Sequence, residues 1–562
     1  MRREASVVNK KVCSFPILFA LLALLIGTCA VVFPASAQAA PTSTGSITVS
    51  GTVASSYDAY QIFSANVVDG DSDAKTFTDL VWASDAVRDA ALPVLHSAGM
   101  PNSQTTAQKA AEWLNTDSHL TGALSAQLAR SLQSSGAVSV ALNAGTAAKL
   151  PSGYWLIVAD DDAIAQGEVG TAPIMALVGG GAVTVKPKAA TPKVSKHALE
   201  DSTAAWQKAA DATVADDLYW RLSATVPAGL TAYDTYAVRF VDTMGAGLDP
   251  SKVAASMRVY VAAGADGGFD AVSADKDGRV GTEPAKGWTD ITAQCATKIA
   301  ADGTFTVRTG DLIAALGGAD AFTAGARVVA VYNAPLNSAC NHGIAKGNPN
   351  EAYLCYPRSP FADQSGDAGF TRTPSDDACA YTWDLALTKR SSDGDKPLAG
   401  AVLSIADDRG RTLAADGTWD AEGKATVTTG EDGRVTVSGV DSGKLEVCEL
   451  KAPKGYTAFE GTRCVTVKAE SLDVDQVAAA KPKLTITAES PLRADSADGS
   501  TGSLEASLIN TPTGTPPSIT TGGFMPSTGD MAMYAAAAAA VAGAALIVVA
   551  LLVKRGGGSH KE

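Results

Sequence analysis

The sequence predicts a mainly β protein of several domains, with helices concentrated in the first third of the chain. Strand-like segments alternate small or polar residues with β-branched or aromatic ones, and turns rich in Gly and Asp separate them. These segments cover residues 46–53, 183–185, 236–241, 326–332, 434–440 and 484–488. Helical spacing of Ala, Leu, Gln and Lys recurs at residues 84–98 and 105–135. The expected fold therefore includes an N-terminal β domain that carries helical insertions.

Changes in composition divide the chain into domains. A stretch rich in Pro, Lys and Ala at residues 186–192 is typical of an extended linker. A second boundary lies near residues 373–377, just before a new strand begins at Tyr381. A tail rich in Thr, Pro and Gly at residues 511–523 is typical of a flexible tether. The predicted domains are 41–187, 189–378 and 379–511, followed by a tether and a short motif at 512–529.

Both ends of the chain have the pattern of targeting segments. Basic residues near the start precede an apolar stretch at residues 15–33 and a small-residue cleavage site, which is the order of a secretory signal peptide. We expect residues 1–39 to be removed after Ala39, with Ala37 as the alternative site. Near the other end, residues 532–553 are apolar and long enough to span a bilayer. The basic residues that follow predict that 554–562 is a cytoplasmic tail.

Composition excludes several classes of function. A formal net charge of −14 argues against nucleic-acid binding, which needs clustered Lys and Arg. The five histidines have no metal-ligand spacing, and the acidic clusters at 160–162 and 275–277 have too few ligands for a calcium loop. Nucleophile-elbow, P-loop and Rossmann patterns do not occur. We therefore predict no metal, no cofactor and no enzymatic turnover.

Six cysteines remain after the expected signal peptide is removed. An even number of cysteines in an exported chain predicts disulfides, and six cysteines allow 15 pairings. Local spacing favours Cys448 with Cys464 and Cys340 with Cys355, which leaves Cys295 for Cys379. Free buried thiols are the alternative.

A distinctive pentapeptide precedes the apolar C-terminal run. Its residues are Met525, Pro526, Ser527, Thr528 and Gly529. The pentapeptide, span and basic tail together resemble the sorting signal of Gram-positive surface proteins, whose usual first residue is Leu. The resemblance implies that a sortase cleaves between Thr528 and Gly529 and joins Thr528 to an amine, finally that of peptidoglycan. It leaves the choice of sortase open, and an ordinary membrane anchor is the alternative.

The last predicted domain contains three motifs in a recognisable order. Residues 449–456 (ELKAPKGY) are similar to the E-box of pilins, while 385–389 (LALTK) and 508–511 (LINT) resemble the first and last strands of Cna B-type domains. This resemblance implies an immunoglobulin-like β-sandwich in which Lys389 and Asn510 form a side-chain amide promoted by Glu449. A surface pair of Lys389 and Glu449 is the alternative. Burial of such residues would favour the neutral amine and the protonated carboxyl group.

The middle domain repeats this logic with different residues. Its segments at 192–196, 220–227 and 241–248 resemble those of fimbrial domains that form internal isopeptide bonds. The resemblance implies that Lys196 is bonded to Asn337 with the help of Asp242. Asn348 and Asn350, in the segment GNPN, are the second choices as partners. They rank second because Asn also favours turns without any chemistry.

The chain as a whole resembles a sortase-assembled backbone pilin. Pilins of this family carry a Tyr-Pro-Lys-like motif at the end of their first domain, and Lys186-Pro187-Lys188 occupies that place here. The resemblance implies tandem Cna-type sandwiches in a secreted, wall-anchored pilus, where Thr528 of one copy joins Lys188 of the next. Lys186 is the alternative nucleophile. A monomeric surface adhesin and a basal pilin remain alternatives, and minor pilins and host ligands remain open as partners.

Overall fold

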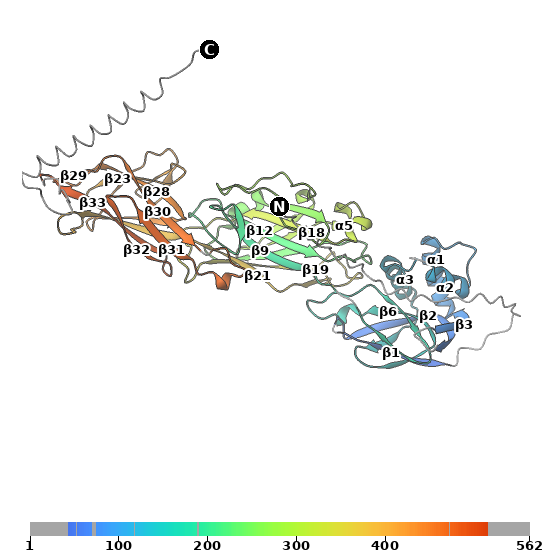
Figure 1. Ribbon diagram of the computed structural model, residues 1–562. Coiled ribbons are helices and arrows are strands. Elements are labelled where there is room, and N and C mark those ends of the chain that lie inside the picture. The colour runs from blue at the N-terminus through green and yellow to red at the C-terminus, as the bar shows by residue number, and fades with distance from the viewer. Residues whose placement is uncertain are drawn as a thin grey trace, which may run out of the picture.

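The computed structural model describes residues 43–51, 53–69, 75–116, 119–187, 190–470 and 472–514. Within these residues, six sheets build three β domains that follow one another along the molecule (Figure 1). The prediction of a mainly β fold with β-sandwich sheets and helices in the N-terminal region is confirmed.

The N-terminal domain combines two sheets with three helices. Its three-stranded sheet has the order β5–β1–β8 and consists of β1 (Thr44–Val49), β5 (Ala148–Pro151) and β8 (Ala182–Val185). The five-stranded sheet consists of β2 (Ser56–Asp69), β3 (Lys75–Trp82), β4 (Val140–Asn143), β6 (Gly153–Ala159) and β7 (Ile174–Val178). Apolar residues of the two sheets form one core, and the helices pack on the other face of the five-stranded sheet.

The helical insertion contains one helix more than the periodicity predicts. Its members are α1 (Asp85–Ser97), α2 (Ala107–Asn115) and α3 (Gly122–Ser135). The second predicted segment is divided because Thr116 ends α2 in an extended conformation, while the Thr121 side chain accepts a hydrogen bond from Leu124 N and caps α3. Gly136 then ends α3 in the left-handed conformation that glycine adopts at low cost.

The middle domain is a sandwich of a six-stranded and a seven-stranded sheet. The six-stranded sheet consists of β9 (Lys193–Glu200), β10 (Ala205–Gln207), β12 (Tyr219–Val226), β14 (Arg258–Ala263), β15 (Thr289–Asp290) and β18 (Ala326–Asn333). The seven-stranded sheet consists of β11 (Ala209–Asp211), β13 (Arg239–Met244), β16 (Ala296–Ile299), β17 (Thr304–Arg308), β19 (Asn348–Pro357), β20 (Phe370–Arg372) and β21 (Asp376–Tyr381). Short helices α4 (Val253–Ser256), α5 (Leu312–Ala315) and α6 (Ala319–Phe322) lie in its loops.

The C-terminal domain is a second sandwich whose first and last strands are parallel neighbours. One sheet consists of β22 (Trp383–Ser391), β27 (Arg434–Val440), β29 (Tyr456–Thr457), β32 (Leu492–Asp498) and β33 (Ser503–Pro512). The other consists of β23 (Val402–Ala406), β24 (Thr412–Leu413), β25 (Trp419–Asp420), β26 (Val427–Thr428), β28 (Gly443–Lys451), β30 (Thr462–Glu470) and β31 (Lys483–Ala488). Because β22 pairs with β33, the two ends of this domain lie in one sheet.

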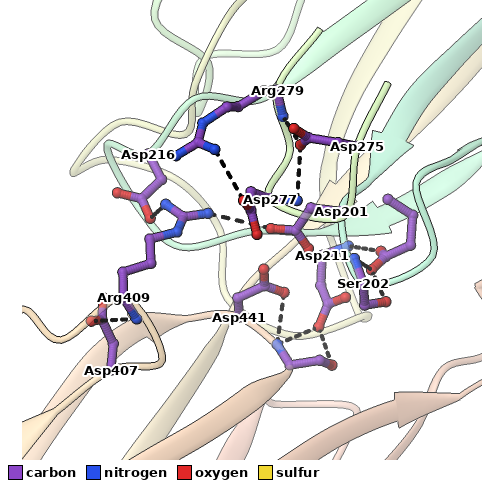
Figure 2. Close-up of polar contacts among 12 residues, drawn as sticks. Asp201, Ser202, Asp211, Asp216, Asp275, Asp277, Arg279, Asp407, Arg409 and Asp441 are labelled. Atoms are coloured by element: carbon purple, nitrogen blue, oxygen red, sulfur yellow. Dashed lines mark hydrogen bonds and ion pairs between the residues drawn. The ribbon is translucent and has the colours of Figure 1, made fainter. Parts of the chain in front are cut away.

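Acidic side chains crowd the junction between the middle and C-terminal domains. The Asp216 carboxylate accepts hydrogen bonds from Nη1 and Nη2 of Arg411, at 2.6 and 2.7 Å, across this junction. Asp211 accepts hydrogen bonds from Trp383 Nε1 (2.6 Å) and Ser442 N (2.9 Å). Figure 2 shows Asp201, Asp211 and Asp441 gathered there. Burial and neighbouring carboxylates raise the pKa of the adjacent Glu200 to about 8, so this group holds a proton at neutral pH.

We expect the thermal stability of this junction to fall between about pH 4.5 and pH 8, because the folded state binds a proton at Glu200 that the unfolded chain releases. The stabilisation is fully present below the unfolded pKa and is lost as the pH rises through the folded pKa. Calorimetry of a Glu200→Gln variant should show a smaller loss of thermal midpoint over this range. The exposed Glu351→Gln is the control, and an unchanged slope in Glu200→Gln would refute this origin.

Candidate functional site

Three polar side chains occupy positions in the C-terminal core where the strand pattern places apolar residues. Alternate residues of a strand point to one face, and Lys389 continues the buried series Trp383, Leu385 and Leu387 on β22. In the same way Asn510 ends the buried series of β33, and Glu449 follows Val447 on β28 of the facing sheet. The alternation within each strand therefore directs Lys389, Glu449 and Asn510 inward.

These three side chains form one buried cluster. Lys389 Nζ hydrogen-bonds to Asn510 Oδ1 and lies 3.2 Å from Glu449 Oε1. Asn510 Nδ2 donates to the same Glu449 oxygen at 2.8 Å. The other carboxylate oxygen of Glu449 accepts from Phe459 N at 3.1 Å, which fixes the carboxylate orientation. The sequence-predicted residues Lys389, Glu449 and Asn510 are thus brought together.

Burial makes the Lys389 amine a better nucleophile. Both the Lys389 and the Glu449 side chains are fully buried. Desolvation lowers the pKa of Lys389 to about 8, although the attraction of Glu449 opposes this shift. About a tenth of the amine is therefore neutral at pH 7, far more than for an exposed lysine, and it lies beside an amide carbonyl and a carboxylate that can accept its proton.

The middle domain brings a comparable cluster together across its two sheets. Lys196 on β9 and Tyr332 on β18 point inward from the six-stranded sheet. Asp242 on β13 and Asn350 on β19 point inward from the seven-stranded sheet. Lys196, Asp242 and Asn350 are each 0% exposed, so this group is sealed inside the sandwich.

Tyr332 connects the members of the middle cluster. Lys196 Nζ contacts Asp242 Oδ2 and lies 2.8 Å from the Tyr332 hydroxyl. The hydroxyl donates to Asp242 Oδ2 at 2.8 Å and accepts from Asn350 Nδ2 at 2.9 Å. Sequence reasoning did not identify Tyr332. The sequence feature that could have identified Tyr332 is its position among the apolar residues of β18. A buried hydroxyl there needs a hydrogen-bond partner.

Burial shifts the acid and the base of this cluster in opposite directions. Desolvation lowers the pKa of Lys196, while the attraction of Asp242 opposes the shift. Desolvation also raises the pKa of Asp242, against the effect of Lys196. Both changes favour a neutral amine beside a neutral carboxylic acid. Asp242 Oδ1 and Asn350 Oδ1 are both buried and have no hydrogen-bond partner among the described residues.

Asn337, the predicted partner of Lys196, lies elsewhere in the structure. Its side chain donates to Ala246 O (2.8 Å) and Leu248 O (3.1 Å) and accepts from Ala339 N, so it stabilises a turn after β18. Asn348 is also engaged elsewhere, with the backbone of Asn341. Of the three candidates, Asn350 is therefore the one whose side chain contacts Tyr332. Tyr332 in turn contacts Lys196. Strand alternation and the packing of the two sheets determine which asparagine lies near Tyr332. The sequence motif contains information on neither.

The predicted disulfides are not present, because the structure has all six described cysteines as free thiols. Cys340 adjoins Asn341, which bonds Asn348 at the start of β19, whereas Cys355 lies about 20 Å along that strand. Cys295 and Cys379 lie at strands separated by β19, β13 and β17. A disulfide requires Cα atoms within about 7 Å, so neither pair can form. Cys464 faces Glu446 rather than Cys448 across the β28–β30 ladder.

Several predicted features lie outside the described residues. These are the signal peptide at 1–39, the motif from Met525 to Gly529, the span at 532–553, the tail at 554–562 and Lys188. Lys186 is described and is exposed directly after β8. Within the described part of the chain, no helix has the length and apolar character needed to cross a bilayer.

Comparison with known proteins identifies part of the chain. Residues 384–481 match the family model of the SpaA prealbumin-like fold domain, which includes Lys389 and Glu449. The trypsin-resistant surface T6 protein of Streptococcus pyogenes serotype M6 is 31% identical over 143 residues. That alignment spans 24% of this chain and 24% of the length of the curated relative.

Solved structures of major pilins also align with the chain over most of their length. The T6 backbone pilin of Streptococcus pyogenes is 16% identical, with 84% of this chain and 99% of that chain covered at a TM-score of 0.44. The major pilin BcpA of Bacillus cereus is 12% identical, with 84% and 99% covered at a TM-score of 0.38. Residues 384–481 thus form a SpaA-type prealbumin-like domain, and the chain resembles the backbone pilins of Gram-positive bacteria.

Proposed function

We propose that this chain is the shaft subunit of a covalently polymerised pilus on the surface of a Gram-positive cell. The observation that carries the proposal is the pair of buried clusters, each with a lysine, a carboxylic acid and an asparagine. Burying a charged lysine and an acid inside a small sandwich is costly, and an apolar core would serve folding alone better. A reaction that converts the lysine amine and the asparagine side chain into a neutral amide, with the acid as its proton carrier, explains why such residues lie there.

In the C-terminal domain the reaction joins Lys389 to Asn510. The neutral Nζ attacks Cγ of Asn510, the new C–N bond forms, and the bond from Cγ to Nδ2 breaks with release of ammonia. Glu449 Oε1 lies 3.2 Å from the amine and 2.8 Å from the leaving nitrogen. It can accept a proton from the amine and deliver it to the leaving group. Glu449 therefore contacts the amide nitrogen of Asn510.

In the middle domain the proposed bond joins Lys196 to Asn350. Proton transfer from Lys196 to Asp242 leaves two neutral groups, which burial favours. A proton on Asp242 Oδ1 that is donated to Asn350 Oδ1 would pair two otherwise unpartnered oxygens and polarise the carbonyl for attack. Attack of Nζ on Cγ of Asn350 then releases ammonia as before. Each cluster reacts once, so the chain modifies itself without turnover.

The two bonds would place covalent links where a pulled subunit would otherwise unzip. The bond in the C-terminal domain would join β22 to β33, the first and last strands of that sandwich. The bond in the middle domain would join β9 of one sheet to β19 of the other. Tension applied along the chain would then pass through amide bonds rather than through sheet hydrogen bonds. This arrangement suits a shaft better than a monomeric adhesin.

Polymerisation in this proposal uses the sortase motif and the linker lysine. Sortase would join Thr528 of one copy to Lys188 of another, and the base of the fibre to peptidoglycan. Such a head-to-tail contact does not close on itself and therefore generates a filament. The neighbouring Lys186 is exposed at the end of β8 and is the alternative acceptor.

A Lys188→Ala variant should lose the polymer. A blot of wall extract boiled in SDS should show a high-mass ladder for the wild type and a single monomer band for the variant, because the proposed acceptor amine is removed. Lys186→Ala is the matched control, two residues away in the same linker, and it should retain the ladder. A ladder that survives in Lys188→Ala but is lost in Lys186→Ala would assign the acceptor to Lys186. A single band in the wild type would exclude the shaft and leave a wall-anchored adhesin or a basal pilin.

A further inference from the structure

A basic cleft lies where the N-terminal domain meets the middle domain. Its volume is about 390 Å³, within the range of small-ligand sites. One wall is the loop Ile164–Gln166 of the N-terminal domain, and the other is the outer face of β13, β19 and β20. Hydrogen bonds from Gly167 N to Thr371 Oγ1 and from Tyr356 OH to Gly167 O, both 2.7 Å, hold the two walls together.

Three arginines and one cysteine form a continuous cross-strand row on this sheet face. Arg308, Arg239, Cys355 and Arg372 are successive cross-strand partners on β17, β13, β19 and β20. Like charges that face each other across strands are destabilising. Here the Phe370 ring lies under both Arg239 and Arg308, with guanidinium carbons 5.6 and 5.5 Å from its centroid, and Tyr353 lies under Arg372. The aromatic rings position the guanidinium groups, but they do not neutralise them.

The residues that line the cleft carry more positive than negative charge. Arg239, Arg358 and Arg372 line it, and Asp367 is the one acid among its described lining residues. Asp367 pairs with Arg239, but its own side chain is 83% exposed. The buried Nε atoms of Arg239 and Arg358 have no hydrogen-bond partner within the described part of the chain. Buried donors of this kind normally have a partner, which can be a bound ion.

We propose that this cleft binds an oxyanion, a carboxylate or phosphate group, between the guanidinium groups of Arg239, Arg358 and Arg372. Arginine presents its donors in a planar fork that fits both kinds of group. The positive cleft stands out in a chain with a net charge of −14 and would concentrate anions locally. The ligand would bridge the two domains, because the N-terminal loop closes one side of the cleft.

Calorimetric titration of the exported chain with sodium phosphate, and separately with sodium acetate, tests the site. Ionic strength is held constant with sodium chloride so that general screening does not change. We expect saturable binding that weakens at least tenfold in Arg372→Gln. Arg372 is exposed and forms no ion pair among the described residues, so this change should leave folding intact. The exposed Arg279→Gln in the same domain is the matched control and should bind as the wild type does.

The outcomes separate the two sources of the anion. Saturable binding of phosphate or acetate to the monomer assigns the cleft to a free anion. If these probes do not bind, sedimentation at low salt tests an acidic side chain of a second copy as ligand. Self-association that Arg372→Gln abolishes and Arg279→Gln preserves would support that source. Equal behaviour of wild type and Arg372→Gln in both measurements would overturn the proposal, whether or not the chain forms a pilus.

Discussion

Replacing Lys389 with methionine should lower the thermal midpoint of the C-terminal domain by roughly 15–20 °C. The two residues of the proposed bond are 121 positions apart in the chain. A crosslink that closes a loop of this length restricts the unfolded chain and stabilises the fold by about 5 kcal/mol. Methionine fills similar space without an amine, so the loss of the crosslink should account for most of the change. Scanning calorimetry of the exported chain measures this effect directly.

Mass spectrometry supplies the independent measurement for the same variant. The wild-type chain should weigh less than its sequence by about 17 Da for each bond, the mass of one ammonia. Lys389→Met should lack one of the two expected losses, after correction for the substitution. Lys454→Met, an exposed change in the same domain, should keep both losses and the wild-type midpoint. A wild-type mass equal to that of the sequence would refute the bonds in both domains.

Replacing Asn350 with alanine should abolish the bond in the middle domain, whereas replacing Asn337 should preserve it. Asn350 Nδ2 lies 2.9 Å from Tyr332 OH, which Lys196 also contacts. Asn337 bonds two backbone carbonyls of a turn. We therefore expect the mass of Asn350→Ala to lack one ammonia loss and its middle domain to unfold at a temperature lower by 10 °C or more, as for a crosslink of several kcal/mol.

The two asparagine variants also discriminate between the motif and the geometry. Asn337→Ala should lose only the hydrogen bonds of a turn, about 1 kcal/mol each, and should retain the wild-type mass deficit. Tryptic peptides should contain a Lys196–Asn350 linkage in this variant and in the wild type. A linkage from Lys196 to Asn337 would instead return the assignment to the sequence motif and remove Asn350 from the proposed chemistry.

Much of the fold and of the C-terminal cluster follows from local sequence patterns. The strands at Arg434–Val440 and Lys483–Ala488 coincide closely with their predicted segments, because alternation is a property of neighbouring residues. Lys389 follows the alternation of its own strand into the core, and the same is true of Asn510. These directions require no knowledge of the other sheet.

Tertiary structure decided which residues meet and which do not. The sequence motifs favoured Asn337 over Asn350, but the packing of β9 and β18 against β13 and β19 brings Asn350 to Tyr332, which also contacts Lys196. The cysteine pairings failed for the same reason, since distance along the chain does not measure distance across a sheet. The basic cleft depends on cross-strand register, which aligns Arg239 with Arg308 and Cys355. By itself, the sequence determined the fold class and the inward direction of the reactive residues, because strand period is local, whereas partners across sheets depend on register and packing.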